Sequence, residues 1–223
     1  MPYGIGFDLY STLVDPLAMS EPLESVVGDV AEQVAAQWRQ KQLEYSFRRA
    51  LMGTYADFDV CAEDALIYAT RSVGVELGES ARSELLAGLR ELAVYPDVAP
   101  GLQALRAQGH MVVVCSNGVE STLREVLMTA GVWPHLDGVV SADDLRTFKP
   151  DPRIYAYLAR RLERELEDTW LVSGSPRDVI GAKSAGLRAA WIKRDPAAVY
   201  DPWGDEPDIV VSDVMELAEA LRA

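Results

Sequence analysis

The sequence predicts an α/β fold in which a parallel sheet is flanked by helices and interrupted by a helical insert after its first strand. Two observations predict this fold. Short apolar runs alternate with helical stretches from residue 95 onward, as in parallel sheets joined by crossover helices. Residues 20–93, by contrast, contain no convincing strand, although an apolar strand precedes them. We therefore expect a core of residues 1–15 and 95–223 and a helical cap of residues 16–94.

The first strand begins at Gly4 and ends at Asp8. Its apolar run, bounded by glycine, is typical of a buried parallel strand. Asp8 then lies at the carboxyl end of the strand, where open α/β sheets bind ligands, and is a candidate nucleophile. Hydrolases that use such an aspartate on phosphate esters normally carry a second aspartate two residues later, whereas this chain has Tyr10. That difference disfavours phosphoryl transfer.

The insert is predicted to be helical because its apolar residues recur about every four positions, which is the spacing of one helix face. The stripe consists of Val26, Val30, Val34, Trp38, Leu43, Phe47 and Leu51. Further helices are predicted at residues 61–73 and 79–92.

After residue 95 the chain is predicted to alternate between helices and strands. Helices are expected at residues 99–108, 119–129, 151–166, 176–185 and from about 213 onward. Strands are expected at residues 111–115, 138–140, 169–173, 189–192 and 208–211. This alternation favours a single parallel sheet that includes the first strand.

Composition disfavours several classes of function. The chain has 21 basic and 35 acidic residues, a formal charge of -14, so phosphate-rich partners such as nucleic acids and anionic membranes would be repelled. Cys61 and Cys115 are predicted to be reduced core residues of a cytoplasmic protein. No apolar run approaches about 18 residues, so neither export nor membrane insertion is expected.

Polar residues follow the apolar runs of three predicted strands. They are Asp8 after the first, Ser116 and Asn117 after the second, and Ser173 and Asp178 after the third. If these strands are parallel neighbours, their ends share one crevice. Taken singly, such a serine is more often a helix cap and such an aspartate an ordinary first-turn carboxylate. Lys149, alone more often a surface lysine, follows the strand near residue 140 and is expected to enter the same crevice.

Several segments of the chain match one known pattern in both order and spacing. They are Asp8 with Thr12 and Leu13, Ser116-Asn117-Gly118, Lys149-Pro150, and Asp178 in its Gly/Ser-rich turn. This set resembles the haloacid dehalogenase superfamily. Trp38–Tyr45 and Phe148–Tyr155 are similar to its L-2-haloacid dehalogenase branch. The resemblance covers nearly the whole chain and implies a Rossmann-like core with a helical cap inserted after the first strand.

The resemblance implies hydrolysis of short (S)-2-haloacids to (R)-2-hydroxy acids through an ester on Asp8. It assigns the leaving halide to Arg39 and the substrate carboxylate to Ser116 and the backbone at Asn117. Lys149 is expected to give electrostatic support to Asp8, and Asp178 is expected to act as the general base. Ser173 and Lys149 are expected to orient the water or the base, and Thr12 and Tyr155 to hold Asp8 and the lysine in place. The implied alkyl pocket consists of Tyr10, Leu43 and Phe58. The expected partners are a small 2-halocarboxylic acid and water, and the expected assembly is a homodimer.

No metal or other cofactor is expected. Phosphatases of the superfamily bind Mg²⁺ through the nucleophile, a carboxylate after the fourth motif strand, and a backbone carbonyl. Their second aspartate is replaced here by Tyr10, and Gly174 stands where a carboxylate ligand would be supplied. Asp178 remains, but alone it is a poor addition to a site for a hard dication that requires several oxygens.

Two positions depart from the dehalogenase pattern. Ser175 stands where that branch typically has asparagine, so one hydroxyl replaces an amide in positioning the water. Arg177 stands where an aromatic pocket residue is common. These differences bear on rate and substrate range more than on reaction class. Two other functions stay open: a Mg²⁺-dependent phosphatase acting on small phosphomonoesters, and a non-catalytic protein that binds a small carboxylate.

Overall fold

The computed structural model describes residues 2–222, and its core is a six-stranded sheet in the order β3-β2-β1-β4-β5-β6. The strands are β1 (Gly4–Phe7), β2 (Met111–Ser116), β3 (Gly138–Ser141), β4 (Thr169–Ser173), β5 (Arg188–Ile192) and β6 (Ile209–Val211). Every neighbouring pair is parallel. The predicted α/β class is therefore confirmed. Because β1 lies between β2 and β4, the three polar strand ends noted in the sequence are adjacent.

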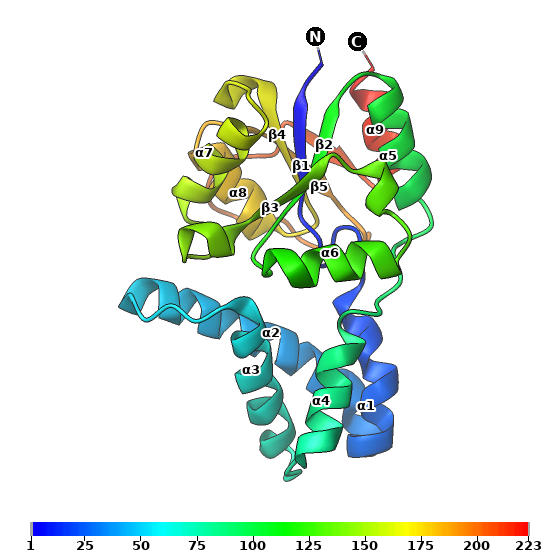
Figure 1. Ribbon diagram of the computed structural model, residues 1–223, viewed down its shortest axis with the longest axis vertical. Helices are drawn as coiled ribbons and strands as arrows, with labels where there is room; N and C mark the ends of the chain where they lie inside the picture. Colours follow the sequence, from blue (N-terminus) through cyan, green and yellow to red (C-terminus); the bar gives the residue numbers. More distant parts are fainter. Residues whose placement is uncertain (1, 223) are drawn as a thin grey trace.

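Helices cover both faces of the sheet (Figure 1). They are α5 (Val98–Ala107), α6 (Glu120–Thr129), α7 (Pro152–Arg161), α8 (Pro176–Ser184) and α9 (Val214–Ala220). Alternate residues of β2 enter two separate apolar clusters, with Val112 and Val114 in one and Val113 and Cys115 in the other. Gly6 lets α7 approach β1 closely, since a Cβ atom there would lie 2.6 Å from Leu158 Cδ2.

The cap consists of α1 (Ser20–Val27), α2 (Ala31–Met52), α3 (Phe58–Ser72) and α4 (Glu79–Gly88), and it faces the carboxyl ends of the strands (Figure 1). An antiparallel bridge between Val14 and Val94 joins the two segments that connect cap and core. These residues adjoin the predicted boundaries at 15/16 and 94/95, which stay a prediction. Within the cap, Trp38 Nε1 on α2 donates to the carbonyl of Ala62 on α3 at 2.8 Å.

The apolar stripe of the cap differs from the prediction at both ends. Gly28 has a φ of 63° and ends α1, so Val30 lies in a short 3-10 turn and the stripe is divided between two helices. At the other end Leu51 is 89% exposed, because the last turn of α2 extends beyond the packed part of the cap. α3 begins at Phe58, since Asp57 Oδ1 accepts from Val60 N at 2.9 Å and caps the helix.

The predicted helix 151–166 is wrong in its last turn, because α7 ends at Arg161. Glu163 adopts a φ of 52°, and the amides of Glu163 and Arg164 donate to the carbonyls of Arg160 and Ala159. This is the hydrogen-bond pattern in which helices commonly end at a glycine. Here a glutamate, not a glycine, adopts the left-handed conformation, so the sequence gives no indication that the helix ends at this point. The other core elements lie within one or two residues of the prediction.

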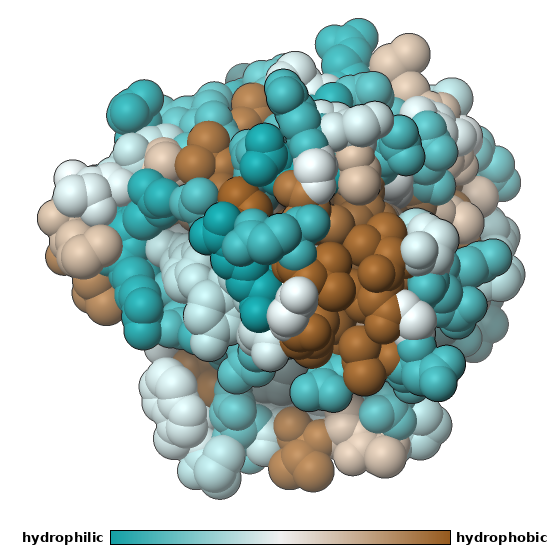
Figure 2. All heavy atoms as spheres, turned by 90° about the horizontal axis from the view of Figure 1, so that it is seen from below, coloured by the Kyte–Doolittle hydropathy of each residue, from teal (hydrophilic) through white to brown (hydrophobic). Residues whose placement is uncertain are grey.

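The surface at the cap end of the molecule carries a contiguous apolar area framed by polar residues (Figure 2). Across residues 2–222 no helix combines the length and apolar character needed to cross a bilayer. Both cysteines are free and buried, as predicted.

Candidate active site

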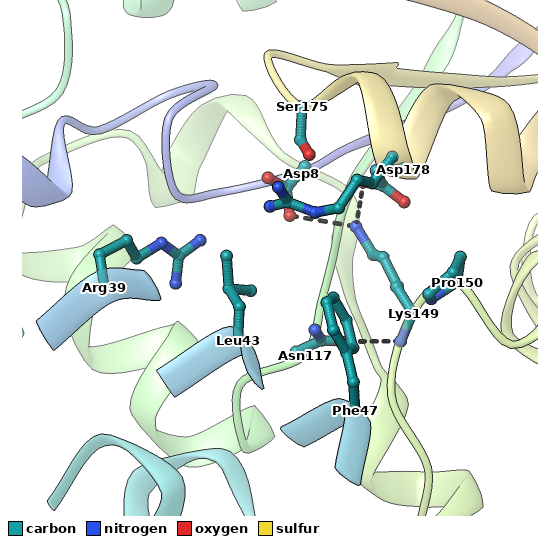
Figure 3. A pocket seen from close by; sticks show the side chains of 10 residues that line it. Asp8, Arg39, Leu43, Phe47, Asn117, Lys149, Pro150, Ser175 and Asp178 are labelled. Carbon is teal, nitrogen blue, oxygen red and sulfur yellow. Dashed lines mark hydrogen bonds and ion pairs between the residues drawn. The ribbon is translucent and has the colours of Figure 1, made fainter. Parts of the chain in front are cut away.

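A small cavity of about 40 Å³ lies between the carboxyl edge of the sheet and α2 (Figure 3). It is lined by Asp8, Arg39, Leu43, Phe47, Asn117, Lys149, Pro150, Ser175, Arg177 and Asp178. The cap contributes Arg39, Leu43 and Phe47, which are spaced by four residues and so lie on one face of α2. The core contributes the charged groups that follow the strands. Both parts of the chain are therefore needed to form the cavity.

Lys149 lies between two carboxylates at the base of this cavity. Its Nζ is 3.0 Å from Asp8 Oδ1 and 2.7 Å from Asp178 Oδ2. The side chains of Lys149 and Asp178 are buried, and that of Asp8 is 14% exposed. Burial disfavours the ammonium, but the two carboxylates outweigh it and raise the pKa of Lys149 above its usual 10.5. Lys149 thus places a fixed positive charge between the carboxyl groups of Asp8 and Asp178.

Asp178 has the environment of a base held in place. Burial raises the pKa of its carboxyl group, and the neighbouring charge of Asp8 adds to this, while Lys149 and Tyr155 oppose it. Tyr155 OH donates to Asp178 Oδ1 at 2.8 Å. The family resemblance implies that Tyr155 holds the lysine, but in the structure its hydroxyl is bonded to Asp178 instead. Gly181 makes room for the phenol, since a Cβ atom there would lie 2.5 Å from Tyr155 Oη.

Replacing Tyr155 with phenylalanine is expected to move the acidic limb of the pH–kcat profile to higher pH. The lost hydrogen bond stabilises the ionised form of Asp178, so its removal raises the pKa of that carboxyl. Because a base acts in its ionised form, activity then disappears at a higher pH as the solution is acidified. Near neutral pH, kcat should fall about tenfold. Tyr157→Phe, on the exposed side of the same helix, is the control. An acidic limb at the same pH in Tyr155→Phe as in the wild type would contradict the role of Asp178 as the general base.

Thr12 and Lys149 hold the two oxygens of Asp8 separately. Thr12 Oγ1 donates to Asp8 Oδ2 at 3.2 Å and accepts from Gly174 N at 2.9 Å. Arg194, which follows β5, donates from Nε and Nη2 to the carbonyl of Thr12 and from Nη1 to Asp97. Arg194 could not be predicted from the sequence because no motif marks it, and its contact with Thr12 forms only when β5 pairs with β4 in the folded chain.

The loop after β4 has no space for a second metal-binding carboxylate. A Cβ atom at Gly174 would lie 2.0 Å from the carbonyl oxygen of Ser11, so no side chain fits at this position. The Lys149 ammonium occupies the space between Asp8 and Asp178. Among residues 2–222 there is no group of three or more His, Cys, Asp or Glu side chains arranged to hold a metal ion.

Of the polar residues at the ends of β2 and β4, some line the cavity and others are buried behind its wall. Asn117 lines the cavity, and its Oδ1 accepts from Lys149 N at 2.8 Å, which fixes the backbone of the lysine. Ser116 Oγ is buried and lies 3.5 Å from Gly118 N. Ser173 Oγ, also buried, accepts from Ser175 N at 3.1 Å and so shapes the turn that presents Ser175 to the cavity.

Arg39 lies against aromatic rings on the cap side of the cavity. Its guanidinium carbon is 5.2 Å from the ring centre of Tyr10 and 5.9 Å from that of Phe58, and Nη1 donates to Gln42 Oε1 at 3.0 Å. Burial raises the pKa of Tyr10 to about 12, so its phenol stays neutral and does not replace an acidic aspartate at this position. Leu43 lies on the same face of α2 as Arg39 (Figure 3).

Comparisons with known proteins agree with this geometry. A curated (S)-2-haloacid dehalogenase of Pseudomonas putida is 32% identical over 218 residues, 98% of this chain and 97% of that protein. One of Burkholderia cepacia is 37% identical over 188 residues, 84% of this chain and 81% of its own. The solved structure of an L-2-haloacid dehalogenase from Xanthobacter autotrophicus with chloropropionic acid covalently bound has a TM-score of 0.95 and 31% identity, covering 100% of this chain and 99% of that one.

The family of haloacid dehalogenase-like hydrolases matches residues 4–186, which include all of the cap and most of the core. The match extends over the segments on which the resemblance rested, from Asp8 to Asp178. The chain belongs to the haloacid dehalogenase-like hydrolase family.

Proposed function

We propose that this protein hydrolyses short (S)-2-haloacids to (R)-2-hydroxy acids through an ester on Asp8, without a metal. The observation that carries the proposal is the placement of charge. Asp8 is held by Thr12 and Lys149 at one wall of the cavity, and the Arg39 guanidinium lies on aromatic rings at the cap side. Nucleophilic displacement of a halide needs a carboxylate nucleophile on one side of the reacting carbon. It also needs a cation on the opposite side to receive the halide.

In the first step an oxygen of Asp8 attacks C2 of the substrate from the side opposite the halogen. A carbon–oxygen bond forms, the carbon–halogen bond breaks, and the halide leaves with the bonding electron pair toward Arg39. Ser116 and the backbone at Asn117 receive the substrate carboxylate. Leu43, Tyr10 and Phe58 surround the alkyl part. Attack from the rear inverts the configuration at C2, which accounts for an (R) product from an (S) substrate.

In the second step water attacks the carbonyl carbon of the Asp8 ester, and Asp178 takes its proton. The tetrahedral intermediate collapses, and the bond breaks between the former carboxyl carbon of Asp8 and the oxygen that is attached to C2. That oxygen takes a proton and leaves in the hydroxy acid. Asp8 returns to its carboxylate with one oxygen from water, and one proton is released to solvent overall. Ser175 and Ser173 shape the side of the cavity where this water is positioned.

The relatives support this assignment. The two curated proteins compared above are both named (S)-2-haloacid dehalogenases, and the Xanthobacter enzyme holds chloropropionic acid covalently. The contiguous apolar area at the cap end (Figure 2) supports the homodimer that the resemblance implies, which light scattering on the purified chain would test.

The test is halide release from L- and D-2-chloropropionate in the presence of EDTA. Release from the L acid alone, with inversion, is the expected result. A single turnover in ¹⁸O-labelled water should place the label in the peptide that contains Asp8 before it appears in the product. Activity that requires Mg²⁺ and acts on phosphomonoesters would favour the phosphatase instead. Binding of haloacids without any halide release would favour a carboxylate-binding protein.

Replacing Arg39 with alanine is expected to lower kcat about 10²- to 10³-fold, because the departing halide loses the cation that stabilises it in the transition state. Arg39→Lys keeps the charge but not the flat guanidinium on the rings, so partial activity is expected. Arg48→Ala on the exposed side of α2 is the control. The measurement is kcat for L-2-chloropropionate, and a rate within threefold of wild type in Arg39→Ala would remove Arg39 from the halide role.

A further inference from the structure

Arg177 is a third cation on the cavity wall, and its place in the proposed reaction is unassigned. It follows Pro176 in the first turn of α8, and its side chain is exposed. Lys149 is paired with two carboxylates, and Arg39 bonds to Gln42 and lies on two rings. Within residues 2–222, by contrast, Arg177 forms no ion pair and its guanidinium donates no hydrogen bond to another residue of the chain. Its guanidinium is therefore available to a ligand.

Arg177 lies where the cavity opens to solvent. The cavity continues into a wider cleft of about 460 Å³ between α2 and the loops of the core. The residues common to the cavity and the cleft are Arg39, Leu43, Phe47, Ser175 and Arg177. A molecule whose reacting carbon lies beside Asp8 can thus extend past Arg177 into the cleft.

The surroundings of Arg177 distinguish it from the groups that hold the substrate at its reacting end. Asn117 and Lys149 lie at the base of the cavity, whereas Leu43 and Phe47 face it from α2 (Figure 3). Lys149 and Arg39 balance the charges of Asp8 and Asp178, so Arg177 gives the cavity one excess positive charge. The chain as a whole has a net charge of -14. A guanidinium in a partly apolar wall matches a ligand that carries an anionic group on its alkyl part.

We propose that Arg177 binds a second carboxylate of the substrate and that the site takes short 2-halodicarboxylic acids, such as 2-chlorobutanedioate. This inference rests on the proposed dehalogenase function. The carboxylate next to the halogen is held at the base of the cavity, and the distal one accepts two hydrogen bonds from the planar guanidinium. Arginine suits this role because its donors match a carboxylate in a bidentate arrangement.

The experiment compares L-2-chlorobutanedioate with L-2-chlorobutanoate, which has a methyl group in place of the distal carboxylate. The wild type should prefer the diacid, by about 30-fold in kcat/KM and mainly through KM. In Arg177→Gln the ratio of the two kcat/KM values should fall about 30-fold, whereas Arg177→Lys should keep part of the preference. Arg124→Gln, which removes one positive charge from an exposed position on α6 outside the cavity and the cleft, is the matched control for long-range attraction.

A second measurement does not depend on turnover. Calorimetry on the wild type should show (R)-2-hydroxybutanedioate binding at least tenfold more tightly than (R)-2-hydroxybutanoate, and Arg177→Gln should remove the difference. Halide release from the monoacid with no preference for the diacid, in turnover and in binding, would overturn the inference and leave the proposed function standing. An equal loss of the preference in Arg124→Gln would show that the preference comes from general attraction by positive charge, and it would also overturn the role of Arg177. Binding of both products without halide release from either acid would overturn the proposed function alone.

Discussion

Replacing Asp8 with asparagine is expected to reduce halide release by at least about 10⁴-fold while leaving the fold intact. An amide is a poor nucleophile, and no other carboxylate can take its place, because Asp178 is held by Lys149 and Tyr155. The amide has nearly the same size as the carboxylate, and its oxygen can still accept from Lys149. Chloride release from L-2-chloropropionate gives the rate, and thermal unfolding followed by circular dichroism reports on the fold.

Asp15→Asn provides the control for Asp8→Asn. Asp15 lies in the same connecting segment, where its carboxylate accepts from Leu17 N at the surface and does not line the cavity. Its rate should stay within twofold of wild type. A variant Asp8→Asn that retained a hundredth or more of the wild-type rate would contradict covalent catalysis at this residue, and so would a trapped ester on any other side chain.

Replacing Lys149 with methionine is expected to abolish activity and to lower the free energy of unfolding by about 3–5 kcal/mol at pH 7. Methionine fills much of the same space, so the main cost is electrostatic: two largely buried carboxylates lose the cation between them. Urea unfolding of both proteins measures the difference. Lys183→Met is the control, because Lys183 pairs with Asp208 at the surface, where such a pair contributes about 0–1 kcal/mol.

The pH dependence of this effect has a definite sign. The pKa of Lys149 in the folded protein lies above the 10.5 of an exposed lysine, so its contribution to stability is complete below pH 10.5. It is lost only as the pH rises through the folded value. In Lys149→Met the unpaired carboxylates have raised pKa values, so the deficit should shrink on acidification as they take up protons. A deficit that is constant between pH 4 and 8 would show that lost packing, not charge, is responsible.

The fold was largely predictable because its signals are local. Apolar runs identified each strand, and the absence of a strand between residues 20 and 93 identified the inserted cap. The predicted helix bounds were wrong where a residue adopts a backbone conformation that its type usually disfavours, or where a regular apolar spacing hides a helix end. Glu163 ends α7 in a conformation that favours glycine, and nothing in its neighbours indicates this. The break between α1 and α2 is marked only by Gly28, which the regular spacing of valines obscured.

The candidate site was predictable as a set of residues and less so as a set of contacts. Strand order brings Asp8, Asn117 and Asp178 to one edge of the sheet, so their grouping follows from topology. Individual hydrogen bonds depend on side-chain directions that a sequence does not encode locally. The bond from Tyr155 to Asp178 and the support of the Thr12 carbonyl by Arg194 are of this kind. Both join segments whose distance is fixed only in the folded chain.

The shared position of Lys149 between Asp8 and Asp178 has a consequence for the timing of the proposed reaction. The charge of Asp8 raises the pKa of Asp178, and the ammonium of Lys149 opposes this. When Asp8 becomes an ester it loses its charge, and Lys149 then has one anionic partner in place of two. The pKa of Asp178 therefore falls at the moment when an ionised base is required. Formation of the ester thus favours the ionised form of Asp178 that the second half-reaction requires, and Lys149 is left with Asp178 as its one anionic partner of the two.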